Sequence, residues 1–512
     1  MSTRSGGFRS RSKAAQSGQA GPPEQSGRSA SPAPRAGARG RGAPRDKGGR
    51  PRRATLRPAR SRVDAPRRVA YEVLAAVRAQ GAYANLVLPA ALRERKIKGR
   101  DAAFATEITY GTLRMQGVLD AVLAHCSSRP LGEVAPEVLD ALRLGAYQVL
   151  YTRVEPHAAV DTSVELVAEA GQERAKGFAN AILRAVARTP APEWVERLSP
   201  RDPLAGAAFR HAHPEWIARS FAAALGVDAA GAAGAAGSGE LERALEADSL
   251  RPTVHLVARP GEISAEELAL VVGGEEGRYS PYAVYLDSGS PSELEPVRQG
   301  LAAVQDEGSQ LIARAVATAP VLGEDSGRWL DLCAGPGGKV ALLGALARID
   351  RARVDAVEPA AHRAELVRKA VRGLPVTVHV ADGRRSGLTP GYDRVLVDAP
   401  CSGLGALRRR PEARWRKQES DIEELRALQY ELLGAALDLV RPGGVVVYST
   451  CSPDLRETRA IVERAVAERG VEELPARDLV PGMDRVGDAT SVQMWPHRHG
   501  TDAMFFAALR RA

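Results

Sequence analysis

Apolar residues recur at helical spacing through the first patterned part of the chain. Between about residues 64 and 188 they return every three or four positions, and strand-like alternation is nearly absent. Short joints containing Gly, Pro or Ser separate the helical runs, as expected for a compact all-α bundle. The predicted helices are Arg67–Arg78, Ala102–Arg114, Val118–His125, Pro136–Tyr151, Val160–Ala170 and Gly177–Ala187.

The pattern becomes mixed in residues 191–300. A helix near Pro214–Leu225 is followed by Gly226–Gly239, an Ala/Gly-rich stretch that is typical of a flexible insertion. A small α/β unit comes next, with predicted strands at Thr253–Val257 and Ala283–Leu286 and a helix at Ala265–Val272. We expect this unit to link the two larger parts.

From residue 301 onward short β-rich runs alternate with helical stretches. This order favours an α/β domain with a doubly wound, mostly parallel sheet. The chain is therefore predicted to be multidomain, with limits at residues 1–62, 63–190, 191–300 and 301–512. The predicted strands of the last domain are Trp329–Leu332, Arg353–Val357, Thr377–Val380, Val395–Val397 and Val445–Tyr448.

The N-terminal residues differ in composition from the rest of the chain. Residues 1–60 hold 15 Lys and Arg against only Glu24 and Asp46, so that their net charge of +13 exceeds the +9 of the whole chain. Such an Arg-, Gly-, Pro- and Ser-rich tail buries too little apolar surface to fold, and we predict that it is disordered. It would add salt-sensitive affinity for nucleic-acid phosphates, or would serve only to keep the protein in solution.

Two absences in the sequence narrow the class of protein. No apolar run reaches about 18 residues and no secretory signal is recognisable, so we expect a cytoplasmic protein without a membrane partner. Cys126, Cys333, Cys401 and Cys451 form no CxxC or Cys/His cluster, which argues against a disulfide framework and against a metal site. These cysteines are therefore candidates for reactive thiols.

A glycine-rich turn follows the first strand of the α/β domain. Cys333, Ala334, Gly335, Pro336, Gly337, Gly338 and Lys339 lead into a predicted helix at Val340–Ala347. The three glycines let a ligand approach the backbone. The spacing is neither G-x-G-x-x-G nor that of a nucleoside triphosphate loop, and alone it is weak support for a nucleotide-like ligand.

Carboxylates at the ends of the next strands specify the ligand further. Glu358 follows the second strand, 23 residues after Gly335, where it can accept both hydroxyls of a ribose. Asp382 follows the third strand and can bind the edge of an adenine, or can be an ordinary turn residue. An adenosyl group with these contacts favours S-adenosylmethionine (S-adenosyl-L-methionine) over NAD.

Two cysteines each follow a strand of the same sheet. Cys401 lies just beyond the strand that ends at Asp398, and Cys451 lies just beyond the strand at Val445–Tyr448. Ligands bind outside the carboxyl ends of parallel strands, so these side chains should face the cavity of the glycine turn. A single cysteine at such a position could be a small buried packing residue. That purely structural role is much less expected for two thiols placed in this way.

Thiols at such a site fit methylation of a pyrimidine carbon. C5 of cytosine is too electron-poor to attack a methyl sulfonium, but addition of a thiolate at C6 makes C5 nucleophilic. Lys339 or the sulfonium could lower the pKa of the thiol. We assign the attack to Cys451, protonation of the ring at N3 to Asp398, and assistance in release to Cys401, although strand-end placement leaves the two cysteines nearly equivalent.

A basic segment follows Cys401. Residues 408–417 read Arg-Arg-Arg-Pro-Glu-Ala-Arg-Trp-Arg-Lys and concentrate cations around one aromatic ring. This composition fits a strand of RNA lying across the mouth of the site, and equally describes a solvated surface.

These motifs together resemble the RsmB/Sun family of ribosomal RNA 5-methylcytosine methyltransferases. The similar segments are Asp331–Lys339, Asp398–Ser402, Ser449–Ser452, residues 304–310, 409–415 and 499–506, with Leu144–Arg153 and Pro156–Ala159 resembling a NusB-like RNA-binding domain. The resemblance implies methylation of small-subunit ribosomal RNA by a monomer, with Cys451 as nucleophile and Cys401 aiding release. It also implies that Cys333–Lys339, Glu358, Asp382 and Asp398 hold the cofactor and that Lys339 steadies the site.

The chain departs from the family pattern at three points. Gly335 stands where alanine is more usual, Glu358 where the family often has aspartate, and the residues up to Glu457 lack the familiar acidic pair with asparagine. The role of Glu457 is left open. An amino-group methyltransferase would have an Asn/Asp-Pro-Pro-aromatic motif in place of Asp398–Cys401, and an RNA-binding scaffold with a vestigial catalytic half remains the alternative function.

Overall fold

The computed structural model describes residues 63–227, 239–287, 289–487 and 490–512. The tail that we predict to be disordered and most of the Ala/Gly-rich stretch lie outside the described residues. The limits of the domains stay predictions. Among the described residues, no helix combines the length and the apolar character needed to cross a membrane.

The first part of the chain is a helical bundle around one apolar core. Asp64 caps its first helix by accepting a hydrogen bond from the Arg67 backbone N–H, and Gly81 ends that helix in a left-handed conformation. The six predicted helices are confirmed. The helices are α1 (Ala65–Gln80), α2 (Ala84–Glu94), α3 (Gly99–Arg114), α4 (Gln116–Cys126), α5 (Pro136–Tyr151), α6 (Pro156–Glu169), α7 (Lys176–Val186) and α8 (Ala191–Leu198).

The sequence did not predict helix α2. Pro89 lies inside this helix, and a proline within a pattern ordinarily marks a helix end. The N-cap residue Tyr83 makes no capping hydrogen bond through its side chain, so the usual polar signal of a helix start is missing too. Tertiary packing of Ala84 and Leu88, both buried, holds the helix in place.

Three helices and a small sheet connect the bundle to the last domain. The helices are α9 (Pro203–Arg210), α10 (Glu215–Leu225) and α11 (Glu240–Ser249). The sheet has the antiparallel order β2-β3-β1-β4, and α12 (Ala265–Val272) packs on it. Its strands are β1 (Val254–Ala258), β2 (Glu275–Glu276), β3 (Ala283–Leu286) and β4 (Ala302–Val304), so that the predicted α/β unit is confirmed.

The last part is built on an eight-stranded sheet of order β10-β12-β9-β8-β5-β6-β7, with β11 paired to β12. The five strands from β9 to β7 are parallel, and β12 and β10 add an antiparallel edge. The predicted doubly wound, mostly parallel sheet is therefore confirmed. Its strands are β5 (Arg328–Asp331), β6 (Arg353–Val357), β7 (Val376–His379), β8 (Tyr392–Asp398), β9 (Val440–Thr450), β10 (Glu472–Leu474), β11 (Val492–Gln493) and β12 (Phe505–Arg510).

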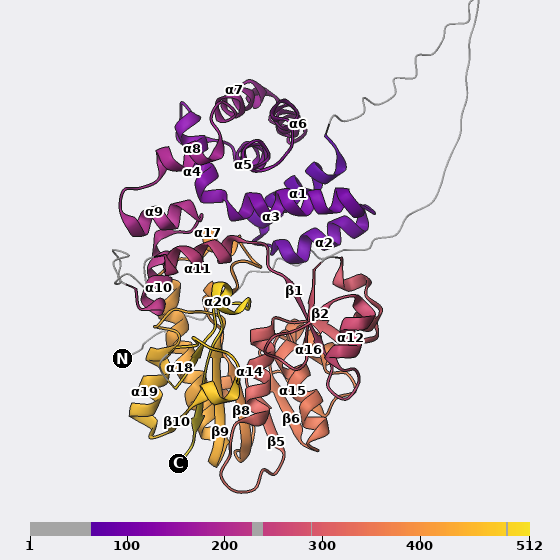
Figure 1. Cartoon of the computed structure of the whole chain (residues 1–512), viewed down its shortest axis with the longest axis vertical. Coiled ribbons are helices and arrows are strands. Elements are labelled where there is room, and N and C mark those ends of the chain that lie inside the picture. Colours follow the sequence, from indigo (N-terminus) through magenta and orange to yellow (C-terminus); the bar gives the residue numbers. More distant parts are fainter. Residues whose placement is uncertain (1–62, 228–238, 288, 488–489) are drawn as a thin grey trace, which may run out of the picture. The chain divides into compact units, whose positions relative to one another are not determined.

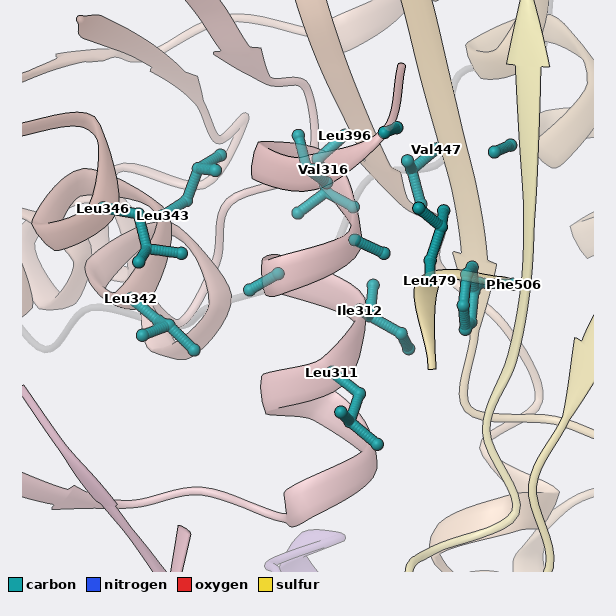
Figure 2. Packing of buried hydrophobic residues seen from close by; sticks show 14 of the residues in the cluster. Leu311, Ile312, Val316, Leu342, Leu343, Leu346, Leu396, Val447, Leu479 and Phe506 are labelled. Carbon is teal, nitrogen blue, oxygen red and sulfur yellow. The ribbon is translucent and has the colours of Figure 1, made fainter. Parts of the chain in front are cut away.

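Helices cover both faces of this sheet (Figure 1). Along β8, Leu396 packs with α14 (Glu307–Thr318), α15 (Gly338–Ile349) and α16 (Ala361–Ala370), whereas its neighbours Val395 and Val397 pack with α18 (Asp421–Leu439) and α19 (Arg459–Arg469). This alternation is the two-residue period of a strand buried on both faces. In Figure 2 the α14 side chains lie between those of α15 and those of the sheet. The labelled residues include Leu311, Ile312 and Val316 of α14, Leu342 of α15, and Val447 and Phe506 of the sheet.

Candidate active site

The parallel strands end along one edge of the sheet and carry the predicted site residues there. Asp331 ends β5, Glu358 follows β6, Asp398 ends β8 and Cys451 follows β9. The parallel pairing of these strands brings residues far apart in sequence to one edge. Ligands of open α/β sheets bind at such an edge.

The glycine-rich turn connects β5 to α15 and has little room for side chains. Gly337 is the N-cap of α15 with a φ of +119°, a conformation that favours glycine. A Cβ on Gly337 would also lie 2.8 Å from the Ala370 Cβ, whereas a Cβ on Gly338 would make only an ordinary van der Waals contact of 3.9 Å with the Gln305 side chain. The N-terminus of α15 therefore presents its backbone N–H groups without side-chain cover.

Gly335 and Glu358, the first two departures from the family pattern, touch one another. A Cβ placed on Gly335 would collide with the carboxylate of Glu358, far inside van der Waals contact. The side chain of Glu358 is 1% exposed, and its Oε1 accepts hydrogen bonds from the Ala360 backbone N–H and from Arg363. The longer acidic side chain occupies the volume that an alanine methyl group would fill.

Asp382 lies in the turn after β7 and is half exposed. Its carboxylate accepts hydrogen bonds from the Arg384 backbone N–H and guanidinium, and Arg384 also pairs with Glu431. The hydrogen bonds from Arg384 lower the pKa of Asp382. Contact of Asp382 with an adenine stays a prediction, and its local bonds fit the turn residue that the sequence left as an alternative.

Asp398 and Lys339 form an ion pair between β8 and α15. Lys339 Nζ lies 2.8 Å from Asp398 Oδ2, and Ser449 Oγ donates to Asp398 Oδ1 at 3.1 Å. Burial opposes the charge of Lys339, but the charge and hydrogen bond of Asp398 outweigh it and raise the pKa of Lys339. The carboxyl group that we predict as the proton donor is thus paired with an ammonium group.

The two strand-end cysteines lie against each other. Cys401 Sγ and Cys451 Sγ are 3.3 Å apart, and both thiols are free. The hydrogen bond from Cys401, with the positive charges of Lys339 and Arg410, lowers the pKa of Cys451 despite burial and the charge of Asp398. The hydrogen bond to Cys451, burial and the charge of Glu457 raise the pKa of Cys401 well above its ordinary value. The surroundings thus distinguish thiols that the sequence left nearly equivalent.

Glu457, whose role the sequence left open, holds the loop that carries Cys401. Its buried carboxylate accepts hydrogen bonds from the Ser402 backbone N–H at 2.8 Å, the Ser402 hydroxyl and Gln429 Nε2 at 3.0 Å. The Gly405 backbone N–H donates to the Cys451 carbonyl at 2.9 Å, which ties the same loop to the second cysteine. Sequence alone gave no signal for this role, because the partners come from two other elements.

Asp331 is a second site residue whose role was not predicted from the sequence. Its Oδ1 accepts a hydrogen bond from the Cys333 backbone N–H, while its Oδ2 is buried without a hydrogen-bond partner. Burial, and then the charge of Asp398, raises the pKa of Asp331 to about 7. Asp331 could have been predicted from the sequence, because it is an acidic residue that ends a strand directly before a glycine-rich turn. Such a carboxylate is suited to receive a cationic ligand group.

The other two cysteines have no nucleophilic surroundings. Cys333 packs against the apolar cluster of β5, β8 and α18, and burial with the nearby carboxylates raises its pKa well above the ordinary value. Cys126 ends α4 and packs against the core of the helical bundle, where burial raises its pKa. Both side chains therefore act as small apolar packing residues in the fold.

The prediction that residues 408–417 present their cations to RNA is wrong for most of them. Arg408 and Arg409 both pair with Asp306 and Asp502, and the side chain of Arg408 is 6% exposed. Arg414 is buried against Asp248 with an N–O distance of 2.8 Å. The acidic partners lie far away in the sequence, so local composition did not reveal that these charges are neutralised inside the protein.

The rest of the segment joins the last domain to the helical bundle. Trp415 Nε1 donates to the Leu113 carbonyl at 2.8 Å. The Trp415 ring packs over Gly117 so closely that a Cβ on Gly117 would lie 2.4 Å from the ring. Arg416 donates to the carbonyls of Gly81 and Ala82. Trp415 and Arg416, in the segment after Cys401, therefore form a seam between the two halves.

The strand order, the glycine turn and the cysteines at the carboxyl edge define an α/β methyltransferase preceded by a helical domain. Residues 319–510 match the family described as 16S rRNA methyltransferase RsmB/F, and residues 64–188 match the NusB family. The chain belongs to the RsmB/F family of methyltransferases, as the following relatives also show.

A putative methyltransferase of Mycobacterium tuberculosis (strain ATCC 25618 / H37Rv) is 56% identical over 91% of this chain and 99% of its own length. The probable ribosomal RNA small subunit methyltransferase B of Bacillus subtilis (strain 168) is 30% identical over 87% of this chain and 98% of its own. The crystal structure of the protein PH0851 has a TM-score of 0.72 at 21% identity, covers 87% of this chain and 99% of that one, and so shares the fold.

Proposed function

We propose that this protein transfers the methyl group of S-adenosylmethionine to C5 of cytosine in RNA, with small-subunit ribosomal RNA as the substrate. One observation carries the proposal: two thiols 3.3 Å apart lie beside the Lys339–Asp398 ion pair at the edge that holds the glycine turn. Methyl transfer to an amino group needs no thiol. The RNA substrates named for the relatives support the choice of RNA.

The residues at the edge fit S-adenosylmethionine. The unpartnered Asp331 Oδ2 can receive the α-ammonium group, the uncovered backbone of Gly337 and Gly338 can approach the methionyl part, and Glu358 can accept ribose hydroxyls. Asp382 is proposed for the adenine edge. When bound, the cofactor supplies an electrophilic methyl group on a sulfonium.

Cys451 is the proposed nucleophile because its pKa is lowered by its surroundings. Its thiolate forms a bond to C6 of cytosine, and the electron pair of the C5–C6 double bond moves into the ring to make C5 nucleophilic. The Lys339–Asp398 pair lies next to Cys451 and holds an exchangeable proton, which can be donated to N3 as negative charge develops there. Asp398 then acts together with Lys339 and not as an isolated acid.

Cys401 is proposed to complete the reaction. After C5 has gained the methyl group it still bears its hydrogen. This hydrogen leaves as a proton, taken up by solvent or by the thiolate that Cys401 becomes when it gives its own proton to Cys451. The C5–H electrons re-form the C5–C6 double bond while the C6–S bond breaks and its electrons return to Cys451. Cys401 keeps its proton at neutral pH because its pKa is raised, and it lies 3.3 Å from Cys451 Sγ. It can therefore protonate or hydrogen-bond the departing thiolate and assist release.

The test uses tritiated S-adenosylmethionine and ribosomal RNA with the wild-type chain, Cys401→Ala and Cys451→Ala. We expect labelled 5-methylcytosine with the wild type and a covalent protein–RNA adduct with Cys401→Ala, because attack still occurs while release is slow. Cys451→Ala should give neither product nor adduct. An adduct in Cys451→Ala would exclude it as nucleophile, and RNA binding without any label would favour the scaffold function.

A further inference from the structure

We propose that the helical bundle supplies part of the substrate site: Tyr83 stacks on a nucleotide that flanks the target cytosine, and Arg410 binds the adjoining phosphate. This inference rests on the proposed function, since it takes single-stranded RNA as the ligand. It assigns a role in substrate binding to a residue outside the catalytic domain.

Tyr83 and Arg410 come from different halves of the chain and contact each other. The guanidinium carbon of Arg410 lies 5.2 Å from the centre of the Tyr83 ring. Arg410 is exposed, unlike Arg408 and Arg414 of the same segment, and its positive charge reaches the thiol of Cys451. Arg410 therefore contacts the aromatic ring, and its charge contributes to lowering the pKa of the Cys451 thiol.

The surface next to Arg410 is apolar and exposed. Tyr83 is 45% exposed and Leu86, three residues further along the first turn of α2, is 66% exposed. An exposed aromatic ring next to an arginine has the composition of single-stranded RNA sites, where bases stack on the ring and the cation attracts phosphate. A flipped or unpaired target base needs its neighbours held in this way.

The loop that carries Tyr83 is fixed to the catalytic domain before RNA arrives. Arg416 donates hydrogen bonds of 2.9 Å to the Gly81 carbonyl and 2.8 Å to the Ala82 carbonyl. The Ala84 backbone N–H donates to Glu412 Oε1 at 3.1 Å, and Glu412 is buried. The backbone on both sides of Tyr83 is thus tied to the loop after Cys401, which limits the positions that the ring can take.

The experiment compares Tyr83→Ala, Tyr83→Trp and Arg410→Gln in the full chain, with Tyr430→Ala as a matched control. Tyr430 also packs with an arginine, Arg464, at 3.7 Å, but it lies on α18 and has no proposed role. Affinity for a fluorescent single-stranded RNA that contains the substrate cytosine is measured by anisotropy. KM for the RNA and kcat are measured separately, and binding of S-adenosylmethionine reports intact folding.

We expect Tyr83→Ala to weaken RNA binding and raise KM about tenfold, which is in the range for loss of one stacked base, with little change in kcat. Tyr83→Trp should retain the affinity, and Tyr430→Ala should behave as the wild type. Arg410→Gln should weaken RNA binding, lower its salt dependence and slow alkylation of Cys451 at pH 7, whereas Tyr83→Ala should leave alkylation unchanged.

Unchanged RNA affinity in Tyr83→Ala with normal cofactor binding would overturn the inference. The same holds if Tyr83→Trp fails as badly as Tyr83→Ala, because the ring would then matter only for packing. Because RNA binding is measured directly, the outcome is separate from the proposed chemistry. A wild type that binds RNA through Tyr83 but transfers no methyl group would contradict only the proposed function.

Discussion

At the scale of single residues, Gly335 and Glu358 show how two departures from a family pattern depend on one another. Each looks harmless alone, because glycine and alanine are both small and both acids can accept ribose hydroxyls. Their contact in the structure makes them a pair: the Glu358 carboxylate fills the place of the missing Gly335 methyl group. The sequence showed both substitutions but not that they touch.

We expect Gly335→Ala to be destabilised by about 1–3 kcal/mol, because the new methyl group forces the buried Glu358 side chain from its place. The double variant Gly335→Ala/Glu358→Asp should recover most of this loss, since the shorter acid vacates the space. Urea unfolding of the two single variants and the double variant measures the coupling. Additive losses would show that the two residues do not compete for volume.

Asp331 gives a prediction of pH dependence. Its pKa of about 7 in the fold exceeds that of an unfolded chain near 3.9, so the folded state holds a proton that the unfolded state has lost between these values. The stability that the protonated group contributes is present at low pH and is lost as pH rises through 7. We expect Asp331→Asn, without ligand, to raise the melting temperature more at pH 8 than at pH 5.

The same variant should weaken binding of S-adenosylmethionine, because it lacks the charge proposed to receive the ammonium group. Calorimetric titrations between pH 5.5 and 7 should show tighter binding by the wild type as pH rises and a flatter profile for Asp331→Asn. A melting temperature that rises equally at both pH values would indicate that Asp331 stays ionised throughout.

At the scale of elements, the sequence predicted periodic segments well and side-chain partners poorly. The strands that carry Asp398 and Cys451 and the six bundle helices follow from apolar periodicity, which the buried faces impose. Helix α2 was missed because Pro89 resembles a helix end. Residues 408–417 were misinterpreted because their neutralising partners, Asp248, Asp306 and Asp502, are distant in sequence.

The site was predictable to a similar degree. Strand ends and glycine spacing located its residues, since parallel strands bring their carboxyl ends to one edge. The ion pair of Lys339 with Asp398 and the unequal surroundings of Cys401 and Cys451 depend on distances between elements. Such distances cannot be deduced from the order of residues along one chain.

Glu457 connects α19 and its preceding turn to the loop after β8, and we expect Glu457→Gln to loosen that loop. The Ser402 N–H and the Gln429 amide both donate to the Glu457 carboxylate. Glutamine has one oxygen instead of two, and its NH2 group would face these donors. About 1–3 kcal/mol of stability should therefore be lost. Removing the negative charge should also lower the pKa of Cys401. Alkylation of Cys401 followed by mass spectrometry across pH 7–10 separates this effect from simple unfolding.

The corresponding control is Glu463→Gln on the exposed face of α19, where the carboxylate pairs only with Arg459 at 3.6 Å. It should leave both stability and the alkylation profile nearly unchanged. If Glu457→Gln shows the same alkylation profile as this control, the carboxylate does not act on Cys401.

At the scale of the whole molecule, the charge of the chain is unevenly distributed between its N-terminal tail and the rest. We expect deletion of residues 1–60 to weaken RNA affinity and to flatten its dependence on salt, because these residues carry 15 cationic side chains that can replace counterions on phosphate. Binding measured between 50 and 300 mM KCl gives the slope. A slope equal to that of the full chain would mean that the tail acts only as a spacer.

The seam formed by Arg414, Trp415 and Arg416 has a consequence for how the two halves depend on one another. A catalytic half produced alone would expose the Trp415 ring to water and would leave the carbonyl partners of Arg416 behind with the helical half. The contacts of Trp415 and Arg416 with the helical bundle therefore help to hold the loop after Cys401 in its folded position. Exchange of this helical domain for an unrelated one would therefore also require new partners for Trp415 and Arg416.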